Sequence, residues 1–489
     1  MKRSKFSLSN YRLLTANMGQ LIPCGLTEVL PGDSIQQATS ALIRCAPMVT
    51  PPMHPVHVRI HHFYVPNRII WDDFEDFITG GPDGMSVPDF PVIKAPASTG
   101  FAVGSLADHL GIRPGVPDIE VSALPFRGVA LIYNEYYRDQ DLQTPLVISK
   151  ASGLDTTTNT SIQHVAWEKD YFTSARPWTQ KGPEVTVPVG ESAPVKWDTF
   201  SGATNADNKF AVGYNSSGVG LGFGDTYGVL TGAVPNSSNN LFADLSSAAG
   251  VDINTLREAF ALQRYEEARA RYGSRYTEYL AYLGVHSSDA RLQRPEYLGG
   301  GKQTIQFSEI LQTGPDGDGD GVGNLKGHGI GALRSNRYRR FFEEHGFIYS
   351  FISIKPKTIY ADGIPRHFNR RIKEDFWQKE LQHIGQQEVL LKEVYAGAPD
   401  PDAVFGFQDR YDEYRRSHSY ISGEFRSVLD DWHFARMFGN TPALNADFIK
   451  STPAERPFAY QDNDVLYMMV NHSIQARRMV AKTGSSFIF

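Results

Sequence analysis

The sequence is poor in cysteine and has no long apolar run. Only Cys24 and Cys45 occur among 489 residues, which excludes a disulfide framework and predicts two reduced, buried thiols. No apolar stretch approaches the length that spans a bilayer, and the start "MKRSKFSLSN" leads into polar sequence instead of the apolar core of a secretory signal. We therefore expect the chain to be made and kept in the cytosol.

Motifs of catalysis and nucleotide binding are missing as well. The sequence contains no G-x-S-x-G, H-E-x-x-H or C-x-x-C, the local patterns of common nucleophiles and metal sites. "GGGKQT" lacks the Ser or Thr that a phosphate-binding loop needs after Lys302, and Phe223 stands where a dinucleotide motif starting at Gly218 needs its third glycine. The sequence thus predicts neither an enzyme nor a bound cofactor.

The composition is that of a folded protein with many short strands. Hydrophobic residues make up 41% and charged residues 21% of the chain, which excludes wholesale disorder. Aromatic residues at 12%, with 29 Pro and 44 Gly, favour strands joined by turns over long helices. Residues 54–71 alternate and predict a strand with one wet face, whereas residues 346–356 are apolar on both faces and predict a central sandwich strand.

Three basic segments are concealed by the formal net charge of −6. Residues 1–12, 323–340 and 471–489 each contain Lys or Arg and no acidic residue. Basic segments on a mildly acidic chain predict one positive face suited to a polyanion. From charge alone, the alternative is three separate solvated segments.

An Asp-Gly run, "GPDGDGDGVG" at residues 314–323, matches half of a calcium loop. Asp316, Asp318 and Asp320 followed by Gly321 reproduce the first half of an EF-hand loop. The twelfth position, where a bidentate glutamate should stand, is Gly327, and neither flank has a helical pattern. We therefore expect an exposed turn and no dedicated metal site, with weak cation binding by the three aspartates as the alternative.

Two long segments depart from the general composition. Between about 190 and 250 charge nearly vanishes and Gly, Ser and Asn dominate, which predicts a long insertion with its own small structure at a surface. Residues 365–489 mix arginine with aromatic residues and offer few short strands. We expect them to form an irregular C-terminal segment that wraps the sandwich or a neighbouring copy.

Long ordered stretches carry a resemblance over nearly the whole chain, among them "HHFYVPNRIIWDDFEDFITGG", "RYGSRYTEYLAYLGVHSSDARLQRPEYLGGGKQTIQFSEILQT" and "GHGIGALRSNRYRRFFEEHGFIYSFISIKP". They resemble the major capsid protein of small single-stranded DNA phages, the gokushovirus branch of the microviruses. The resemblance implies a mainly β fold, an eight-stranded antiparallel jelly roll with large loop and helical insertions, as one domain over residues 1–489. It also implies about sixty copies closed into a T=1 icosahedral shell around a circular single-stranded DNA genome.

The resemblance gives the insertion and the basic segments a function in the virion. In this family the segment at 190–250 corresponds to a protrusion around the threefold axes, so we expect it to contact a bacterial surface receptor. The candidate receptor-facing residues are Tyr214, Asn215, Phe223 and Tyr227. Assembly is expected in the cytoplasm of the host bacterium, together with other phage structural or scaffolding proteins.

The basic segments are expected to hold the genome at the inner face of the shell, because Lys and Arg neutralise phosphates while aromatic rings stack on unpaired bases. The candidates are Lys2, Arg3, Lys5, Arg12, Arg337, Tyr338, Arg339, Arg340, Arg477 and Arg478. For the group at 337–340, an inter-subunit salt-bridge cluster explains the sequence equally well. A rival from another class is a monomeric β-sandwich that binds or cleaves glycans, which predicts convergent carboxylates and exposed aromatic residues in one cleft.

Overall fold

The computed structural model describes residues 3–183, 185, 253–273, 275–311 and 325–482, together with the backbone of five short strands between 195 and 243. The chain divides into two compact units, one formed by Met1–Lys181 with Glu267–Phe489 and the other by Gly182–Glu266. In the smaller unit the short strands are β8 (Val195–Trp197), β9 (Val212–Tyr214), β10 (Leu221–Phe223), β11 (Tyr227–Gly228) and β12 (Leu241–Ala243). There β9, β10 and β11 form one antiparallel sheet and β8 pairs with β12.

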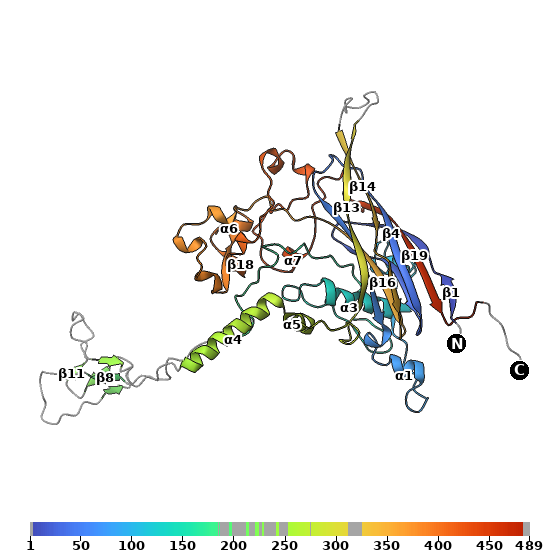
Figure 1. The fold of residues 1–489 in the computed structure, drawn as a ribbon, viewed down its shortest axis with the longest axis horizontal. Helices are drawn as coiled ribbons and strands as arrows, with labels where there is room; N and C mark the ends of the chain where they lie inside the picture. The colour runs from blue at the N-terminus through green and yellow to red at the C-terminus, as the bar shows by residue number, and fades with distance from the viewer. Residues whose placement is uncertain are drawn as a thin grey trace. The chain divides into compact units, whose positions relative to one another are not determined.

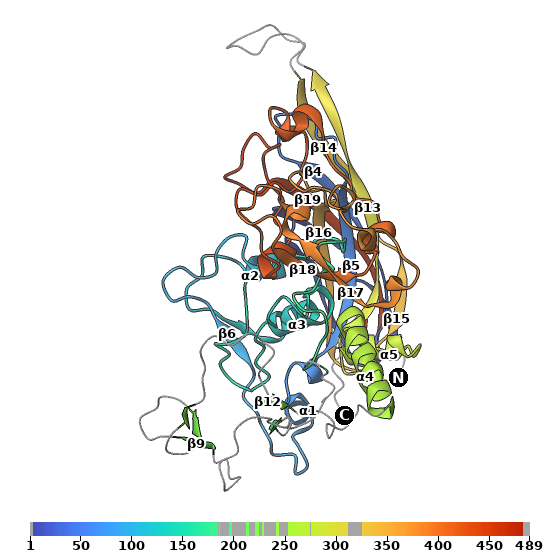
Figure 2. The same ribbon diagram turned by 90° about the vertical axis from the view of Figure 1, so that its left-hand side faces the viewer.

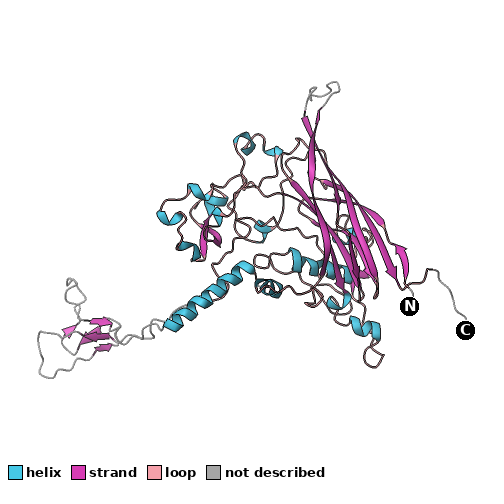
Figure 3. Ribbon diagram, viewed as in Figure 1, coloured by secondary structure: helices cyan, strands magenta, loops and turns pink. Residues whose placement is uncertain are grey.

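The larger unit is built on a curled antiparallel sheet, drawn in magenta in Figure 3. Its strands are β1 (Ser4–Ser7), β2 (Asn10–Ala16), β3 (Leu21–Val29), β4 (Ser34–Cys45), β5 (Val56–Pro66), β13 (Glu296–Leu311), β14 (Leu325–Arg334), β15 (Tyr338–Phe341), β16 (Gly346–Pro356) and β19 (Leu466–Arg478). Along the sheet the order is β1, β19, β4, β14, β13, β5, β16, β3. Since β1 and β2 share one side of β19, and β14 and β15 share one side of β4, these strands occupy eight positions. The prediction of a mainly β, antiparallel jelly roll is confirmed.

The long strand β13 connects the two halves of the sheet. Its residues 296–305 pair with β5, and its residues 306–311 pair with β14. The half containing β19 and β4 can therefore fold over the half containing β5, β16 and β3. Alternate side chains of both halves meet in a buried core that includes Cys24, Ile43, Val58, Ile60, Ile352, Met468 and Val470. Burial of this apolar surface is the main stabilising term for such a sandwich.

His472 is a polar residue at a core position of β19. Its Nε2 atom lies 2.9 Å from the carbonyl oxygen of Cys24, which can only accept, so Nε2 donates and Nδ1 accepts. The Nδ1 atom lies 2.9 Å from the hydroxyl oxygen of Thr39. Gly25 leaves room for the ring, because a Cβ atom at this position would lie 2.7 Å from Nε2. The core therefore holds a neutral imidazole in one defined orientation.

His62 of β5 extends this buried polar network. Its Nδ1 atom lies 2.8 Å from the hydroxyl oxygen of Ser350, and its Nε2 atom lies 3.3 Å from that of Ser335. Gln37 donates to Ser350 at 3.2 Å and accepts from the hydroxyl of Tyr338 at 2.8 Å. Burial lowers the pKa of His62 to about 3. A buried network in which every polar group has a hydrogen-bond partner fixes the register of facing strands, because only one alignment of the strands gives each group its partner.

The outer face of the β5–β16 half is covered by helices. A second apolar cluster joins Phe63, Tyr349 and Phe351 of the strands to residues of α2 (Leu106–Leu110) and α3 (Leu124–Ile132). Gly128 allows α3 to approach, because a Cβ atom there would lie 2.0 Å from the hydroxyl oxygen of Tyr349. Arg127 of α3 forms a 2.9 Å ion pair with Asp155, and both side chains are fully buried.

The remaining α-helices of the described chain are short except α4 (Ile253–Tyr272). They are α1 (Phe74–Thr79), α5 (Tyr276–Tyr282), α6 (Leu391–Val394) and α7 (Ala446–Ile449), and α3 continues as a π-helix over Tyr133–Tyr137. Small strand pairs are formed by β6 (Val92–Lys94) with β7 (Glu120–Ser122) and by β17 (Gln386–Leu390) with β18 (Val404–Asp409). None of the helices within the described part of the chain is long and apolar enough to cross a membrane.

One prediction about the C-terminal segment is wrong. Residues 365–489 were expected to be irregular, but Leu466–Arg478 form β19, a strand between β4 and the N-terminal strands of the main sheet. Every second side chain from Leu466 to Ala476 is buried. The alternation was hidden because its buried positions include His472 and its exposed positions include Met469, so apolar and polar residues did not separate cleanly.

Candidate nucleic-acid interface

The face of the sheet formed by β1, β19, β4 and β15 is uncovered in the larger unit. In Figure 1, β1, β19 and β4 bound one side of the sheet, while α3, α6, α7 and β18 lie on the other side. Figure 2, viewed from that other side, shows α3, β17 and β18 in front of the strands. The outward side chains of β1, β19, β4 and β15 are exposed or half-buried, except that of Ala38, which is buried.

Strand register brings the three basic segments together on this face. Lys5 of β1 lies opposite Arg477 of β19, and Arg477 lies opposite Ser34 of β4. On its other side Ser34 lies opposite Phe341 of β15. Neighbouring strands are about 4.8 Å apart, so this single row places residues from the start, the middle and the end of the chain within about 15 Å of one another.

A second row continues the same surface. Arg339 of β15 lies opposite Gln36 of β4, which lies opposite Gln475 of β19. Because side chains two residues apart share a face of a strand, Arg339 lies beside Phe341. The guanidinium of Arg3 lies 4.9 Å from the centre of the Phe341 ring. This cation–π contact holds Arg3 against the sheet.

The outward positions of these strands carry positive charge and no negative charge. The cations at outward positions are Lys5, Arg44, Lys326, Arg334, Arg339 and Arg477, and no outward residue of β1, β2, β4, β14, β15 or β19 is Asp or Glu. At the other end of the face Tyr11 and Leu13 are exposed, at 70% and 74%. The surface thus has a cationic region and a separate region of exposed apolar and aromatic side chains. Arg44 was not among the predicted residues; its alternating position in β4 is the signal that identifies it.

Several predicted contacts are already engaged within the chain. Arg478 points to the inner side of β19, where its guanidinium lies 2.9 Å from the buried carboxylate of Asp33. Arg12 donates to the carbonyl oxygen of His109 at 3.1 Å, and burial lowers its pKa. Arg340 forms a 2.9 Å ion pair with Glu296. These three arginines have partners within the chain. The alternation of inward and outward side chains along their strands could have indicated this.

Tyr338 is a correction to the predicted set. Its hydroxyl donates to Gln37 in the sandwich core, and its ring lies 5.4 Å from that of His62. Burial raises its pKa. A ring held in this way cannot stack on a base, so Phe341, which is 46% exposed, is the aromatic residue that β15 offers to the outer face. Arg337, at the bend before β15, is exposed.

Other predicted residues fall outside what the structure describes. Lys2, Asn215, Asp316, Asp318 and Asp320 lie outside the described residues, and Tyr214, Phe223 and Tyr227 are described for their backbone only. The flanks of the Asp-Gly run are strands, with β13 ending at Leu311 and β14 beginning at Leu325. Over the described ranges no group of three or more His, Cys, Asp or Glu side chains could hold a metal ion.

An antiparallel jelly roll is the fold of many viral shell proteins, and comparison with known proteins assigns the chain to that class. The chain belongs to the family described as "Capsid protein (F protein)", which matches residues 1–487. It is 37% identical over 475 residues to capsid protein VP1 of Bdellovibrio phage phiMH2K, covering 93% of this chain and 89% of that one. It is 32% identical over 547 residues to capsid protein VP1 of Chlamydia phage 1, covering 94% and 91%. A third relative, capsid protein VP1 of Spiroplasma virus 4, is 33% identical over 485 residues, covering 92% and 87%.

These relationships establish the general role of the chain. It is a structural capsid protein of a gokushovirus-type phage, it acts in the virion, and it is not an enzyme. Membership of this family implies that many copies assemble into a shell. The rival interpretation as a monomeric glycan-active sandwich is therefore set aside.

Proposed function

We propose that about sixty copies of this chain close into a T=1 shell around a circular single-stranded DNA genome, with the β1–β19–β4–β15 face turned toward the DNA. The observation that carries this proposal is the convergence of Lys5, Arg339 and Arg477 on one sheet face, whose outward strand residues include no Asp or Glu. A sequence-independent binder needs this combination of cations and exposed aromatic rings, because every nucleotide offers a phosphate and a π-face.

Charge reversal on this face tests the proposal. Replacing Lys5 and Arg477 together by Glu should leave shells that sediment like wild type but contain much less DNA. The two residues are surface-exposed and opposite each other on neighbouring strands, so the change affects charge more than packing. The measurement is the ratio of absorbance at 260 nm to that at 280 nm in nuclease-treated particles.

A matched control tests whether the loss of DNA requires charge reversal on this face or follows from any reversal of surface charge. Lys373, whose side chain is 87% exposed, lies in the 3-10 helix Lys373–Asp375, away from the sheet. Its replacement by Glu together with Lys94→Glu should leave packaging unchanged. Normal DNA content in the Lys5→Glu, Arg477→Glu variant would refute the placement of the genome on this face.

We propose further that the insertion contacts the surface of the host bacterium. Two features support this: residues Gly182–Glu266 form a compact unit of their own, and the sequence from about 190 to 250 is nearly without charge. A surface segment that is not part of the main core can vary without disturbing the shell. Replacing residues 190–250 with a short Gly-Ser linker should preserve particles and abolish adsorption to host cells; unchanged infectivity would contradict this function.

A further inference from the structure

A cleft of about 690 Å³ lies against the outer face of the β5–β13–β16 half of the sandwich, on the other sheet from the proposed genome face. Its floor is formed by the three strands, and its walls come from residues 136–140, residues 165–169 and α5. Seven cationic side chains line it: Arg59, Arg138, Lys169, Arg176, Arg275, Lys302 and Lys355. Only Asp139, Glu168 and Glu278 are acidic among its described lining residues. Its volume is in the range of small-ligand sites.

The cations on the floor are adjacent through strand register. Lys302 of β13 lies opposite Arg59 of β5, and Arg59 lies opposite Ser353 of β16, two residues before Lys355. Glu168 is the carboxylate near them, at 2.6 Å from Arg59 and 3.8 Å from Lys302. One carboxylate therefore balances a group of three cations.

Lys355 is the deepest of the three cations. It is 9% exposed, and its ammonium donates to the carbonyl oxygen of Ala166, a neutral group. Burial, and after it the charge of Arg59, lower the pKa of Lys355 to about 8. An anion in the cleft would relieve the repulsion between these cations, so binding an anion and keeping Lys355 protonated favour each other.

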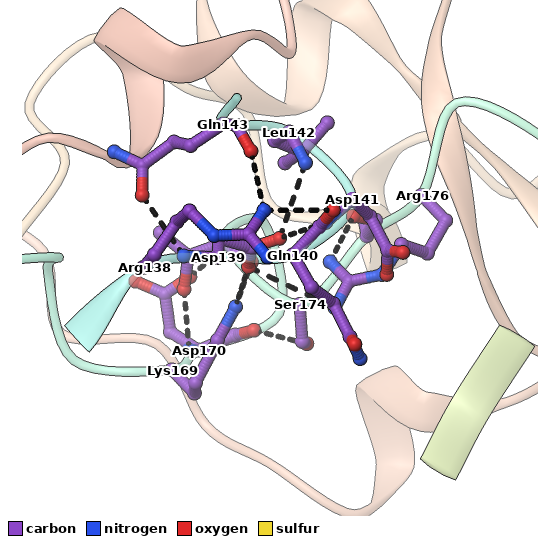
Figure 4. A network of polar contacts seen from close by, with 12 residues as sticks. Arg138, Asp139, Gln140, Asp141, Leu142, Gln143, Lys169, Asp170, Ser174 and Arg176 are labelled. Atoms are coloured by element: carbon purple, nitrogen blue, oxygen red, sulfur yellow. Dashed lines mark hydrogen bonds and ion pairs between the residues drawn. The ribbon is translucent and has the colours of Figure 1, made fainter. Parts of the chain in front are cut away.

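Asp139 of the opposite wall and the nearby Asp141 are already paired, as Figure 4 shows. Lys169 forms an ion pair with Asp139, and Arg176 lies 2.9 Å from Asp141. Arg138 donates to the carbonyl oxygen of Gln143 at 2.7 Å. The positive charge of the floor is therefore not cancelled from this side.

We propose that this cleft binds a phosphoryl anion, held by Arg59, Lys302 and Lys355 and flanked by the aromatic rings of Tyr136 and Trp167. Arginine and lysine are the usual partners of phosphate oxygens, Arg through two parallel hydrogen bonds and Lys as a point charge. The cleft accommodates a mononucleotide or a sugar phosphate. It is separate from the sheet face assigned to the genome, so the failure of one proposal does not refute the other.

The test is equilibrium dialysis of purified particles against radiolabelled inorganic phosphate. Lys302→Gln should weaken binding about tenfold, because it removes one charge-assisted contact from a side chain that is 48% exposed and not needed for packing. Glu168→Gln should tighten binding several-fold, because it removes the competing carboxylate; a purely structural role for Glu168 would not produce a gain. Lys94→Gln, at an exposed lysine paired with Asp118, should leave phosphate binding unchanged.

Competition identifies the source of the phosphoryl group. Stronger displacement by thymidine 5′-monophosphate indicates a nucleic-acid phosphate, and stronger displacement by glucose 6-phosphate indicates a phosphorylated sugar of a surface polymer. Either ranking supports the site. Absence of saturable phosphate binding by wild-type particles, or equal affinity in wild type and Lys302→Gln, would overturn the proposal.

Discussion

Acidification should destabilise the chain through the buried imidazole of His62. The side chain is completely buried, and both of its ring nitrogens contact hydroxyl groups of the core. Desolvation is the first cause of its lowered pKa, and the nearby imidazole of His472 adds to it. Protonation therefore places a charge in the interior of the sandwich, where no described carboxylate contacts it.

The magnitude follows from the difference between the two pKa values. The pKa of His62 is about 3 in the folded chain, whereas that of an exposed imidazole is about 6.5. The unfolded chain binds the proton first as the pH falls, so this contribution to stability is complete above about pH 6.5 and is lost progressively between pH 6.5 and 3. At pH 5 the loss amounts to about 2 kcal/mol, since each pKa unit corresponds to about 1.4 kcal/mol.

Replacing His62 with Gln isolates this term. The variant is expected to be less stable than wild type at pH 7.5, but its free energy of unfolding should fall by about 2 kcal/mol less between pH 7.5 and pH 5. The assay is urea unfolding followed by tryptophan fluorescence at both pH values. His383→Gln, at an exposed histidine, should keep the full pH dependence of wild type. An unchanged pH dependence in His62→Gln would refute the reasoning.

Three further predictions concern buried groups. Arg127→Ala should lower the free energy of unfolding by about 3–5 kcal/mol, because it removes the ion-pair partner of a fully buried carboxylate; a loss below about 1 kcal/mol in urea unfolding would contradict this. Burial raises the pKa of Cys24 and of Cys45 to about 12, so a thiol reagent at pH 8 should label both only after denaturation, and fast labelling of native protein would be inconsistent with their placement. Gly25→Ala should cost about 1–3 kcal/mol in thermal unfolding, because the new Cβ meets the ring of His472 at 2.7 Å; wild-type stability would show that the ring can move.

Local patterns in the sequence were enough to predict some elements. The apolar run at 346–356 became β16, a buried strand that pairs on both sides and ends at Pro356, as expected for an apolar segment stopped by proline. The stretch 54–71 contains β5, whose residues Val56, Val58 and Ile60 are buried in the core. In both cases the periodicity of a few neighbouring residues carries the information.

Long-range pairing could not be predicted in the same way. The contact between Lys5 and Arg477 joins residues 472 positions apart, and composition contains no information about register. The three basic segments were identified, but only the sheet shows that they share one face. Tyr338 was misassigned because its hydroxyl is satisfied inside the protein, which a sequence pattern cannot distinguish from an exposed ring.

The orientation of the sheet in the assembled particle tests the central claim most directly. Electron cryomicroscopy of purified, DNA-filled particles should show the outward side chains of β1, β19, β4 and β15 lining the inner surface of the shell, with nucleic-acid density in contact with Lys5, Arg339 and Arg477. If this face instead lies on the outside of the particle, or is covered by a neighbouring copy of the chain, the proposed genome interface is wrong.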